Sequence, residues 1–360
     1  MRFQHVLALE TSCDDTSAAI VRADGFVVGC ISANQDLQHR PFGGVVPEIA
    51  SRNHTLQILP LIEELFARTK FSAAQIDGMA VTSRPGLIGS LLVGVVTAKT
   101  LALIYGRPFV GVNHLEGHLL APFLRDEKYT PPEGFTYPYL ALAVSGGHTT
   151  LYHVKGLGAY EVLGRTVDDA AGEALDKFAK VVGLGFPGGA RVDEAAKQGN
   201  AKAFQLPRTM RNEDSLDFSF SGLKAAAVRL VESIPPEQLM QKTADLCASY
   251  QEAVVDSLMY KLDLAQKNIS NIKRIVVTGG VSANSRLRAV AAEWAQARSL
   301  QLVLPPLRYC TDNAAMIGFA GIQRLNRGES ADQRLAPSSA SYDEDFTASR
   351  FALHSARGKT

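Results

Sequence analysis

Short apolar segments separated by polar turns make up the start of the chain. Residues 6–10 are an apolar run with an acidic end, and a polar turn follows at residues 11–16. Residues 17–21 and 25–31 are two more short apolar segments. Such runs between polar turns are typical of buried β-strands. The sequence therefore predicts three strands at the beginning of the chain.

Helix and strand patterns then alternate up to a polar, proline-containing segment at residues 126–137, which reads as a linker. Spacing and turn residues predict a helix at residues 54–66, a strand at 76–81 and a long helix from residue 87. A strand at 109–112 and a short helix from residue 115 follow.

The opening pattern returns after the linker, with strands at 139–144, 149–154 and 160–163 around a polar turn at 145–148. The recurrence favours two lobes on one plan, although any α/β protein produces such strands. The rest predicts one strand at 275–278 and helices at 170–182, from 223, from 244 and at 314–324. From Gly328 the chain is polar, with Arg350, Arg357 and Lys359, and we expect a loop.

Composition and size fit an ordinary globular protein. The chain has 360 residues, 46% of them hydrophobic and 20% charged, which suggests two domains or lobes. The longest apolar segment, residues 87–104, is interrupted by glycine, lysine and hydroxyl residues. A membrane helix needs about 20 predominantly apolar residues, so we predict a buried helix and no contact with a membrane.

Cysteine usage and the start of the chain point to the cytoplasm. The four cysteines are scattered, without a Cys-x-x-Cys pair, so we expect thiols rather than disulfides. Residues 2–10 run directly into a strand and do not resemble a signal peptide. The formal net charge of +1 is low for a protein that binds nucleic acid by its own charge. RNA contact would therefore need a local patch or a partner.

Two histidines in the segment His114-Leu115-Glu116-Gly117-His118 are candidates for holding a metal ion. Four residues apart on a helix, both imidazoles reach the same side. The segment follows a predicted strand, where α/β sheets bind ligands. Glu116 does not directly follow His114, so the general base of a His-Glu-x-x-His metalloprotease is missing. The alternative is two unrelated histidines.

A metal also needs a third ligand, and Asp312 is our candidate because it stands where a loop enters a helix. The alternative is that Asp312 only caps that helix.

Glycine-rich turns are the second group of candidate residues. They occur at residues 145–148, 186–189 and 279–284, and small residues allow a backbone to approach phosphate or ribose closely. The last turn lies between a strand and a helix, where amides favour an anion. None fits the P-loop or the dinucleotide fingerprint, and tight structural turns are the alternative.

Carboxylates near these turns are the third group. Asp14 and Asp15 lie in the first turn, and Asp193 follows the second glycine-rich turn. We place residues 168–169 and 173–177 on a helix. Most acidic side chains on helices are simply solvated, and this is the alternative interpretation of the acidic residues there. A carboxylate beside a glycine turn could instead hold a hydroxyl of ribose or substrate.

Eight segments together resemble the universal tRNA N6-adenosine threonylcarbamoyltransferase family, once labelled a glycoprotein endopeptidase, and specifically its bacterial branch. They lie at residues 10–16, 43–52, 113–118, 144–149, 172–177, 217–224, 279–284 and 310–315. Leu175 stands where the family has an aromatic residue, which is a conservative departure.

The resemblance implies an actin-like α/β fold, related to sugar kinases and Hsp70, with two ribonuclease-H-like lobes and a nucleotide cleft. We expect an N-terminal lobe at 1–136, a C-terminal lobe at 137–327 whose last helix packs back on the first lobe, and a polar tail at 328–360.

The resemblance also implies the ligands. One divalent metal, iron(II) or alternatively zinc, would be held by His114, His118 and Asp312. Threonylcarbamoyl-AMP would be bound by Ala143, Val144, Ser145, Gly146, Gly147, Asp176, Gly189, Asp193 and Asn284. The group would be transferred to N6 of adenosine 37 in tRNAs that read codons beginning with A, and AMP released. An inactive paralogue and a small ATPase would be partners. No catalytic residue is assigned.

Three other functions remain as alternatives. A metallopeptidase would use the same histidines but lacks the base. A sugar or acetate kinase explains the glycine turns and leaves the histidines unused. A nucleotide-gated scaffold would be non-catalytic. An activated anhydride needs no strong nucleophile, only alignment, exclusion of water and stabilisation of an oxyanion, which suits transfer.

Overall fold

The computed structural model describes residues 3–211, 215–341 and 346–348 and divides them between two compact units. The first unit takes the residues up to Gly134 together with Pro305–Asp343, and the second takes Phe135–Leu304 and the C-terminal residues. Each unit is built on one mixed β-sheet. Arg350, Arg357 and Lys359, expected in a terminal loop, lie outside the described residues.

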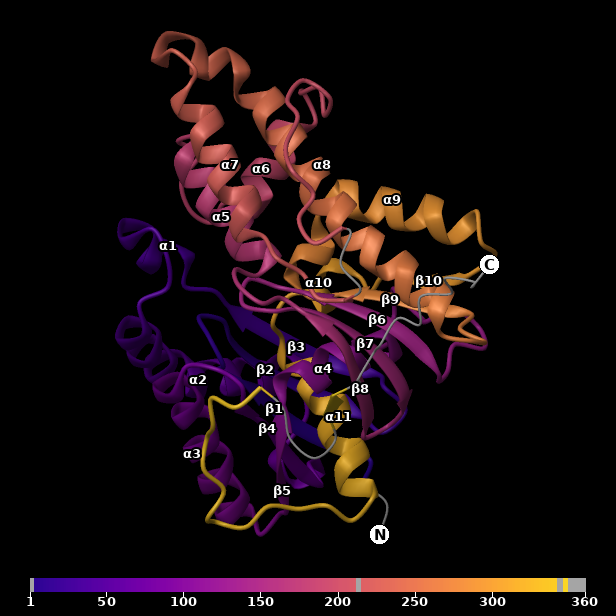
Figure 1. Ribbon diagram of the computed structural model, residues 1–360. Coiled ribbons are helices and arrows are strands. Elements are labelled where there is room, and N and C mark those ends of the chain that lie inside the picture. The colour runs from indigo at the N-terminus through magenta and orange to yellow at the C-terminus, as the bar shows by residue number, and fades with distance from the viewer. Residues whose placement is uncertain (1–2, 212–214, 342–345, 349–360) are drawn as a thin grey trace. The chain divides into compact units, whose positions relative to one another are not determined.

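The first unit holds a five-stranded sheet in the order β3-β2-β1-β4-β5 (Figure 1). The first two pairings, β3-β2 and β2-β1, are antiparallel, and β1-β4 and β4-β5 are parallel. The strands are β1 (His5–Glu10), β2 (Thr16–Arg22), β3 (Val27–Ala33), β4 (Gly78–Arg84) and β5 (Phe109–Asn113).

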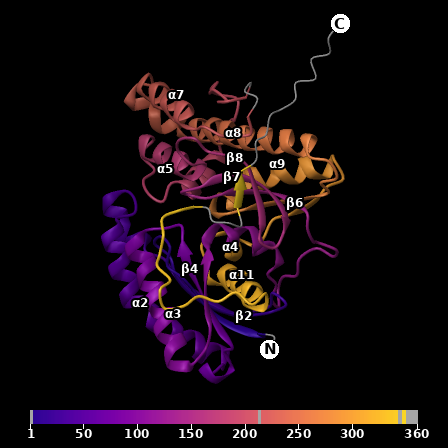
Figure 2. The same cartoon turned by 60° about the horizontal axis from the view of Figure 1, so that its bottom comes forward.

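Helices cover both faces of this sheet, because both faces are apolar. One face carries large apolar side chains and the other carries small ones. On one face Leu7, Leu9 and Ile20 pack with the long helices α2 (Pro47–Thr69) and α3 (Ile88–Tyr105). The other face is covered by α11 (Ala314–Asn326), as Figure 2 shows. There small residues allow a close approach, with Gly318 of the helix beside Ala8 and Gly321 beside Ala80. The remaining helices of this unit are α1 (Asp36–His39), α4 (His114–Leu120) and α10 (Leu307–Cys310).

Helix α3 is the one described helix whose length and composition would let it cross a membrane. In that window 33% of the residues are buried, and the helix packs on α2 and β4. The predicted helix from Leu87 is therefore present, but the expectation that it is buried holds only for the side that faces the sheet. A core helix passes the same test of length and composition, so its apolar character is weak evidence for a membrane.

The second unit repeats the plan of the first. Its sheet has the order β10-β9-β6-β7-β8-β11, with β6, β7 and β8 antiparallel to one another and β6, β9 and β10 parallel. The same order and directions as β1 to β5 confirm two lobes on one plan. The strands are β6 (Tyr139–Val144), β7 (Thr149–Gly156), β8 (Ala159–Arg165), β9 (Arg274–Thr278), β10 (Gln301–Val303) and β11 (Phe346–Ala348).

Five helices pack around the core of the second unit. They are α5 (Ala171–Val181), α6 (Gly189–Ala196), α7 (Ser221–Glu232), α8 (Pro236–Asn268) and α9 (Ser285–Gln296). The stacked rings of Phe178 and Tyr250, 4.0 Å apart, join α5 to α8. Two expectations were wrong. Helix α8 begins well before residue 244, and Asp168 precedes α5, where its carboxylate accepts hydrogen bonds from the amides of Phe220 and Ser221.

The C-terminal part of the chain returns to the first unit. Helix α11 packs on β1, β2 and β4 and groups with the first unit, which resumes at Pro305. The segment after Gly328 is held on the first sheet, because the amide of Ala331 donates to the carbonyl of Phe109 (2.8 Å) and that of Ser338 to the carbonyl of Ser83 (2.9 Å). Strand β11 then pairs in parallel with β8 of the second unit.

Candidate metal centre and nucleotide pocket

Helix α4 places both histidines of the predicted metal site on one side. Strand β5 ends at Asn113, whose side-chain oxygen accepts a hydrogen bond from the amide of Leu115 (2.9 Å) and caps the helix. His114 and His118 are buried, and their rings stand edge to face with centres 4.7 Å apart. The spacing on a helix therefore produces the convergence that the sequence predicted.

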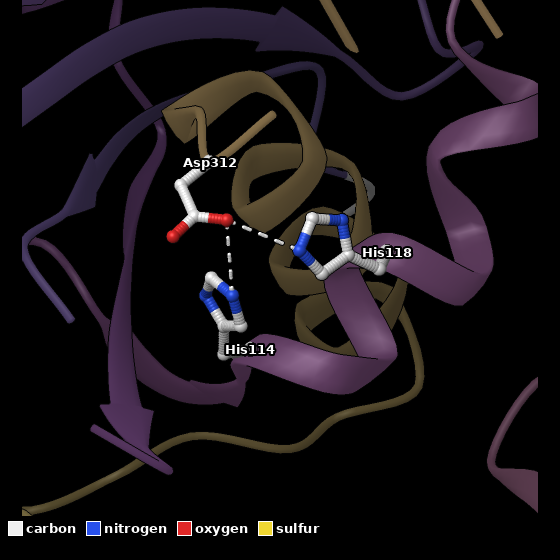
Figure 3. A group of neighbouring side chains, drawn as sticks. All are labelled: His114, His118 and Asp312. Atoms are coloured by element: carbon white, nitrogen blue, oxygen red, sulfur yellow. Dashed lines mark hydrogen bonds and ion pairs between the residues drawn. The ribbon is translucent and has the colours of Figure 1, made fainter. Parts of the chain in front are cut away.

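Asp312 completes the group, as Figure 3 shows. Its Oδ1 lies 3.3 Å from Nε2 of His114 and 3.2 Å from Nε2 of His118, and the three candidate ligand atoms lie within 4.8 Å of one another. The alternative reading of Asp312 as a helix cap is wrong. Asn313 caps α11 instead, by accepting a hydrogen bond from the amide of Met316 (3.0 Å).

Glu10 orients the first histidine. Its Oε2 lies 3.0 Å from Nδ1 of His114 and also accepts a hydrogen bond from the hydroxyl of Thr82. A carboxylate at Nδ1 leaves Nε2 of His114 available for a ligand, which is the usual outer contact of a metal-bound histidine. Sequence reasoning did not assign this role, although the acidic end of an apolar strand was the signal for it.

The electrostatics of the site favour a bound cation. Burial opposes charge on His114, but the carboxylates of Asp312 and Glu10 outweigh it and raise its pKa well above the usual value. Burial would raise the pKa of Asp312, yet His114 holds it well below its usual range. Burial lowers the pKa of His118. The carboxylate of Glu10 is fully buried and that of Asp312 is 26% exposed, so the pair favours positive charge beside it, and a divalent cation would supply that charge. The residues fit a metal.

Glu116 of the same helix is directed elsewhere. It is fully buried, and its Oε2 pairs with Nε of Arg324 at 2.7 Å. A glutamate held in this pair is not available to activate water, so the geometry agrees with the sequence in disfavouring a peptidase.

A polar cavity of about 670 Å³ adjoins Asp312 in the first unit. Asp14 and Asp15 of the first turn line it together with Asp36, Asp126 and Arg308. Burial, with added repulsion from Asp312, raises the pKa of Asp15 to about 8. Two of the candidate carboxylates, Asp14 and Asp15, therefore lie at the wall of this cavity.

A second cavity, of about 480 Å³, lies in the second unit and gathers five of the predicted substrate contacts. They are Gly146, Asp176, Gly189, Asp193 and Asn284. Gly172, Leu175 and Gly280 line the same cavity. The other four predicted contacts, Ala143, Val144, Ser145 and Gly147, are not among its lining residues. The first two lie buried in β6, and the others belong to the turn after it.

The polar side chains of this cavity hold its loops in place. Oδ1 of Asp176 accepts hydrogen bonds from the amides of Gly188 (2.7 Å) and Gly189 (3.0 Å). Asp193 accepts hydrogen bonds from the amide and hydroxyl of Ser285. Asn284 caps α9 through Oδ1 and donates to Gln251 through Nδ2 (2.7 Å). Their first role is therefore to shape the wall.

Gly279 and Gly280, which are neighbours in the turn at residues 279–284, differ in why a glycine is present. Gly279 has φ +88°, and a Cβ there would lie 2.4 Å from the carbonyl oxygen of Val144. At Gly280, which begins the short 3-10 helix η4 (Gly280–Ala283), a Cβ would meet nothing within 4 Å. Gly279 is needed by the fold, whereas Gly280 leaves open space on the cavity wall.

Comparison with known proteins decides the family. The model of the family described as tRNA N6-adenosine threonylcarbamoyltransferase matches residues 26–319. Proteins of that name from Bdellovibrio bacteriovorus and Anaeromyxobacter dehalogenans are 58% and 50% identical to this chain. The alignments cover 95% and 91% of this chain and 99% and 96% of the relatives. The chain belongs to this family. The threonylcarbamoyltransferase resemblance predicted from the sequence is thereby confirmed, and the chain is an enzyme of the transferase class.

Two solved structures of low sequence identity share the fold of this chain. Full-length HypF in the phosphate- and nucleotide-bound form matches with a TM-score of 0.57 and 12% identity, over 91% of this chain and 47% of HypF. Component A of the (R)-2-hydroxyglutaryl-CoA dehydratase of Acidaminococcus fermentans matches with a TM-score of 0.52 and 14% identity, over 89% of this chain and 98% of that one. The predicted actin-like α/β fold is correct.

Proposed function

We propose that this chain transfers the threonylcarbamoyl group of threonylcarbamoyl-AMP to N6 of adenosine 37 in tRNAs that read codons beginning with A, with release of AMP. The observation that carries the proposal is the 58% identity to a named transferase over 95% of the chain. The metal triad and the glycine-lined cavity support it, because the three implied ligands converge and five of the nine implied substrate contacts line one cavity.

The residues of the second unit suit the adenylate. The cavity offers small residues at Gly146, Gly189 and Gly280, and open space at each of them. Backbone amides can approach a phosphate closely at such positions. The loops are held by Asp176 and Asp193, so the wall is formed before the ligand arrives, which reduces the cost of ordering it.

The residues of the first unit suit a metal, for which we propose iron(II), with zinc as the alternative. His114, His118 and Asp312 would hold it and leave a position open for substrate. Bound there, it would supply Lewis acidity toward an acyl or phosphoryl oxygen. Glu10 keeps Nε2 of His114 directed at the site.

Removing one ligand should sharply reduce metal retention, because two of the three protein ligands do not make a stable site. We expect His114→Ala and Asp312→Ala proteins to lose most of the metal that the wild type retains. Elemental analysis of the purified proteins measures it. His153→Ala, a histidine of β7 outside the triad, is the matched control. Stoichiometric metal in both ligand variants would contradict the assignment.

The partners we propose are tRNA, an inactive paralogue and a small ATPase. Helix α3 supports a protein partner because it is apolar on two sides. Its buried side faces the sheet, and Ile88, Leu92, Val96 and Leu103 are exposed at intervals of four, four and seven residues. Leu56 and Leu59 are exposed on the neighbouring α2. Exposed apolar patches of this kind mark interaction sites. We propose that the paralogue covers this face and that the protein works in the cytoplasm.

The function and the partners are tested together in one assay. Labelled threonylcarbamoyl-adenylate, unmodified tRNA and metal are mixed with the chain alone or with paralogue and ATPase. We expect little multiple turnover by the chain alone, since its net charge is +1, and full turnover with the partners, with one AMP released for each modified tRNA. Leu92→Glu should abolish the partners' effect, and Leu37→Glu, exposed on α1, should not. Full turnover by the isolated chain at physiological salt would exclude the partner proposal alone.

A further inference from the structure

The two elements that carry the metal ligands touch each other directly. Helix α4 carries His114 and His118, and Asp312 stands just before α11. Helix α4 has seven residues, and a helix this short owes its place to packing rather than to its own stability. How α4 lies on α11 therefore decides whether the three ligand atoms converge.

Two of the contacts between α4 and α11 bear on the spacing of the helices. At Gly117 the helices approach so closely that a Cβ would lie 2.9 Å from Cδ1 of Ile317 and 3.0 Å from Cγ of Met316. One residue earlier, Oε2 of Glu116 meets Nε of Arg324 at 2.7 Å. The first contact is apolar packing alone, whereas the second joins the two helices by a charged hydrogen bond.

The ion pair is largely buried, and Arg324 is also held by a second carboxylate. The side chain of Glu116 is 0% exposed and that of Arg324 is 11% exposed. Nη1 of Arg324 also donates to Oε2 of Glu329 (2.9 Å), which fixes the guanidinium beyond the end of α11. A buried pair of charges often adds little stability compared with apolar residues of similar size, but it permits only a narrow geometry.

We infer that Glu116 and Arg324 are positioning residues for the metal centre: their ion pair fixes α4 on α11 so that both histidines meet Asp312. The inference rests on the proposed metal site. It explains why a buried glutamate stands between the two histidines in a helix whose seven residues are all buried. Neither residue touches the metal position, so their effect must pass through the ligands.

The test separates positioning from stability by replacing the whole pair. Glu116→Met together with Arg324→Met removes both charges and fills the space, so the thermal midpoint should stay within a few degrees of wild type. Cobalt(II) alone is the probe, because its visible absorption reports the geometry of its ligands. We expect the double variant to bind cobalt roughly ten- to a hundredfold more weakly, the range for contacts outside the ligand set, with an altered spectrum.

The controls distinguish this inference from the metal site itself. Glu252 and Arg286 form a comparable but more exposed ion pair between α8 and α9 at 2.6 Å, and their replacement by methionines should leave cobalt binding unchanged. His118→Ala should lose the ion. If the wild type binds no cobalt, the metal site and the inference both fall. If the wild type binds and the Glu116/Arg324 variant binds equally with the same spectrum, only the inference falls.

A second variant covers the case in which the methionine pair does not fold. Arg324→Lys keeps the positive charge but loses the planar fork that reaches Glu116 and Glu329 together. We expect weaker cobalt binding and a changed spectrum in a folded protein. Wild-type cobalt binding by folded Arg324→Lys would overturn the inference.

Discussion

His118→Ala should abolish transfer of labelled threonylcarbamoyl to tRNA without creating protease activity. His118 is 2% exposed and directs Nε2 at Asp312, so its removal takes one of the three ligands from the site. Loss of several kcal/mol of transition-state stabilisation lowers the rate by about a hundredfold or more. The measurement is label in tRNA and AMP released, with the complete set of partners.

The control and the contradictory result are both specific. His153→Ala, in the second unit, should retain wild-type transfer, because His153 is paired with Glu161 on β8. A protein substrate is offered in parallel to each variant. If label never enters tRNA with the wild type while the protein substrate is cut in a His118-dependent way, the transferase function is wrong and the chain is a peptidase.

Gly280→Val should block binding of the adenylate while the fold persists. A Cβ at Gly280 meets nothing within 4 Å, so the added side chain projects into the cavity that Gly280 lines and not into the protein. We expect at least a hundredfold loss of affinity for adenine nucleotide, about 2.7 kcal/mol. Calorimetric titration measures the affinity, and circular dichroism shows that the variant is folded.

Gly279→Val is the contrasting variant at the next position. The φ of +88° and the nearby carbonyl of Val144 make a side chain there strained, by about 1–3 kcal/mol or more. We expect a lower midpoint of unfolding from this change and not from Gly280→Val. Wild-type nucleotide affinity in folded Gly280→Val would show that the turn serves only the fold.

Much of the fold was predictable because each buried strand is a short apolar run. The strands at residues 6–10, 139–144 and 275–278 correspond to β1, β6 and β9. Helix α8 was harder, since its first turns are polar and only partly buried, so an apolar spacing appears only after residue 245. The start of α2 at Pro47 was missed for the same reason, although proline is common at the first helical position.

The metal triad was predictable only in part from local rules. Two histidines four apart imply a shared helix face, but Asp312 lies far along the chain, and only the packing of α11 brings it to α4. Glu10 and Arg324 could not be assigned, because a carboxylate or guanidinium shows no sign in the sequence of the partner it meets across the fold. The glycine turns predicted a cavity, but not that Asp176 and Asp193 bind its own loops.

The division of the first unit between both ends of the chain has a consequence for synthesis on the ribosome. Residues 135–304 form most of the second unit as one continuous stretch, which can fold as soon as it emerges. The first unit has all five strands early, but it lacks α11 and Asp312 until the last part of the chain is made. The nascent protein therefore exposes one face of its first sheet throughout most of translation, and it acquires the capacity to hold a metal only at the end.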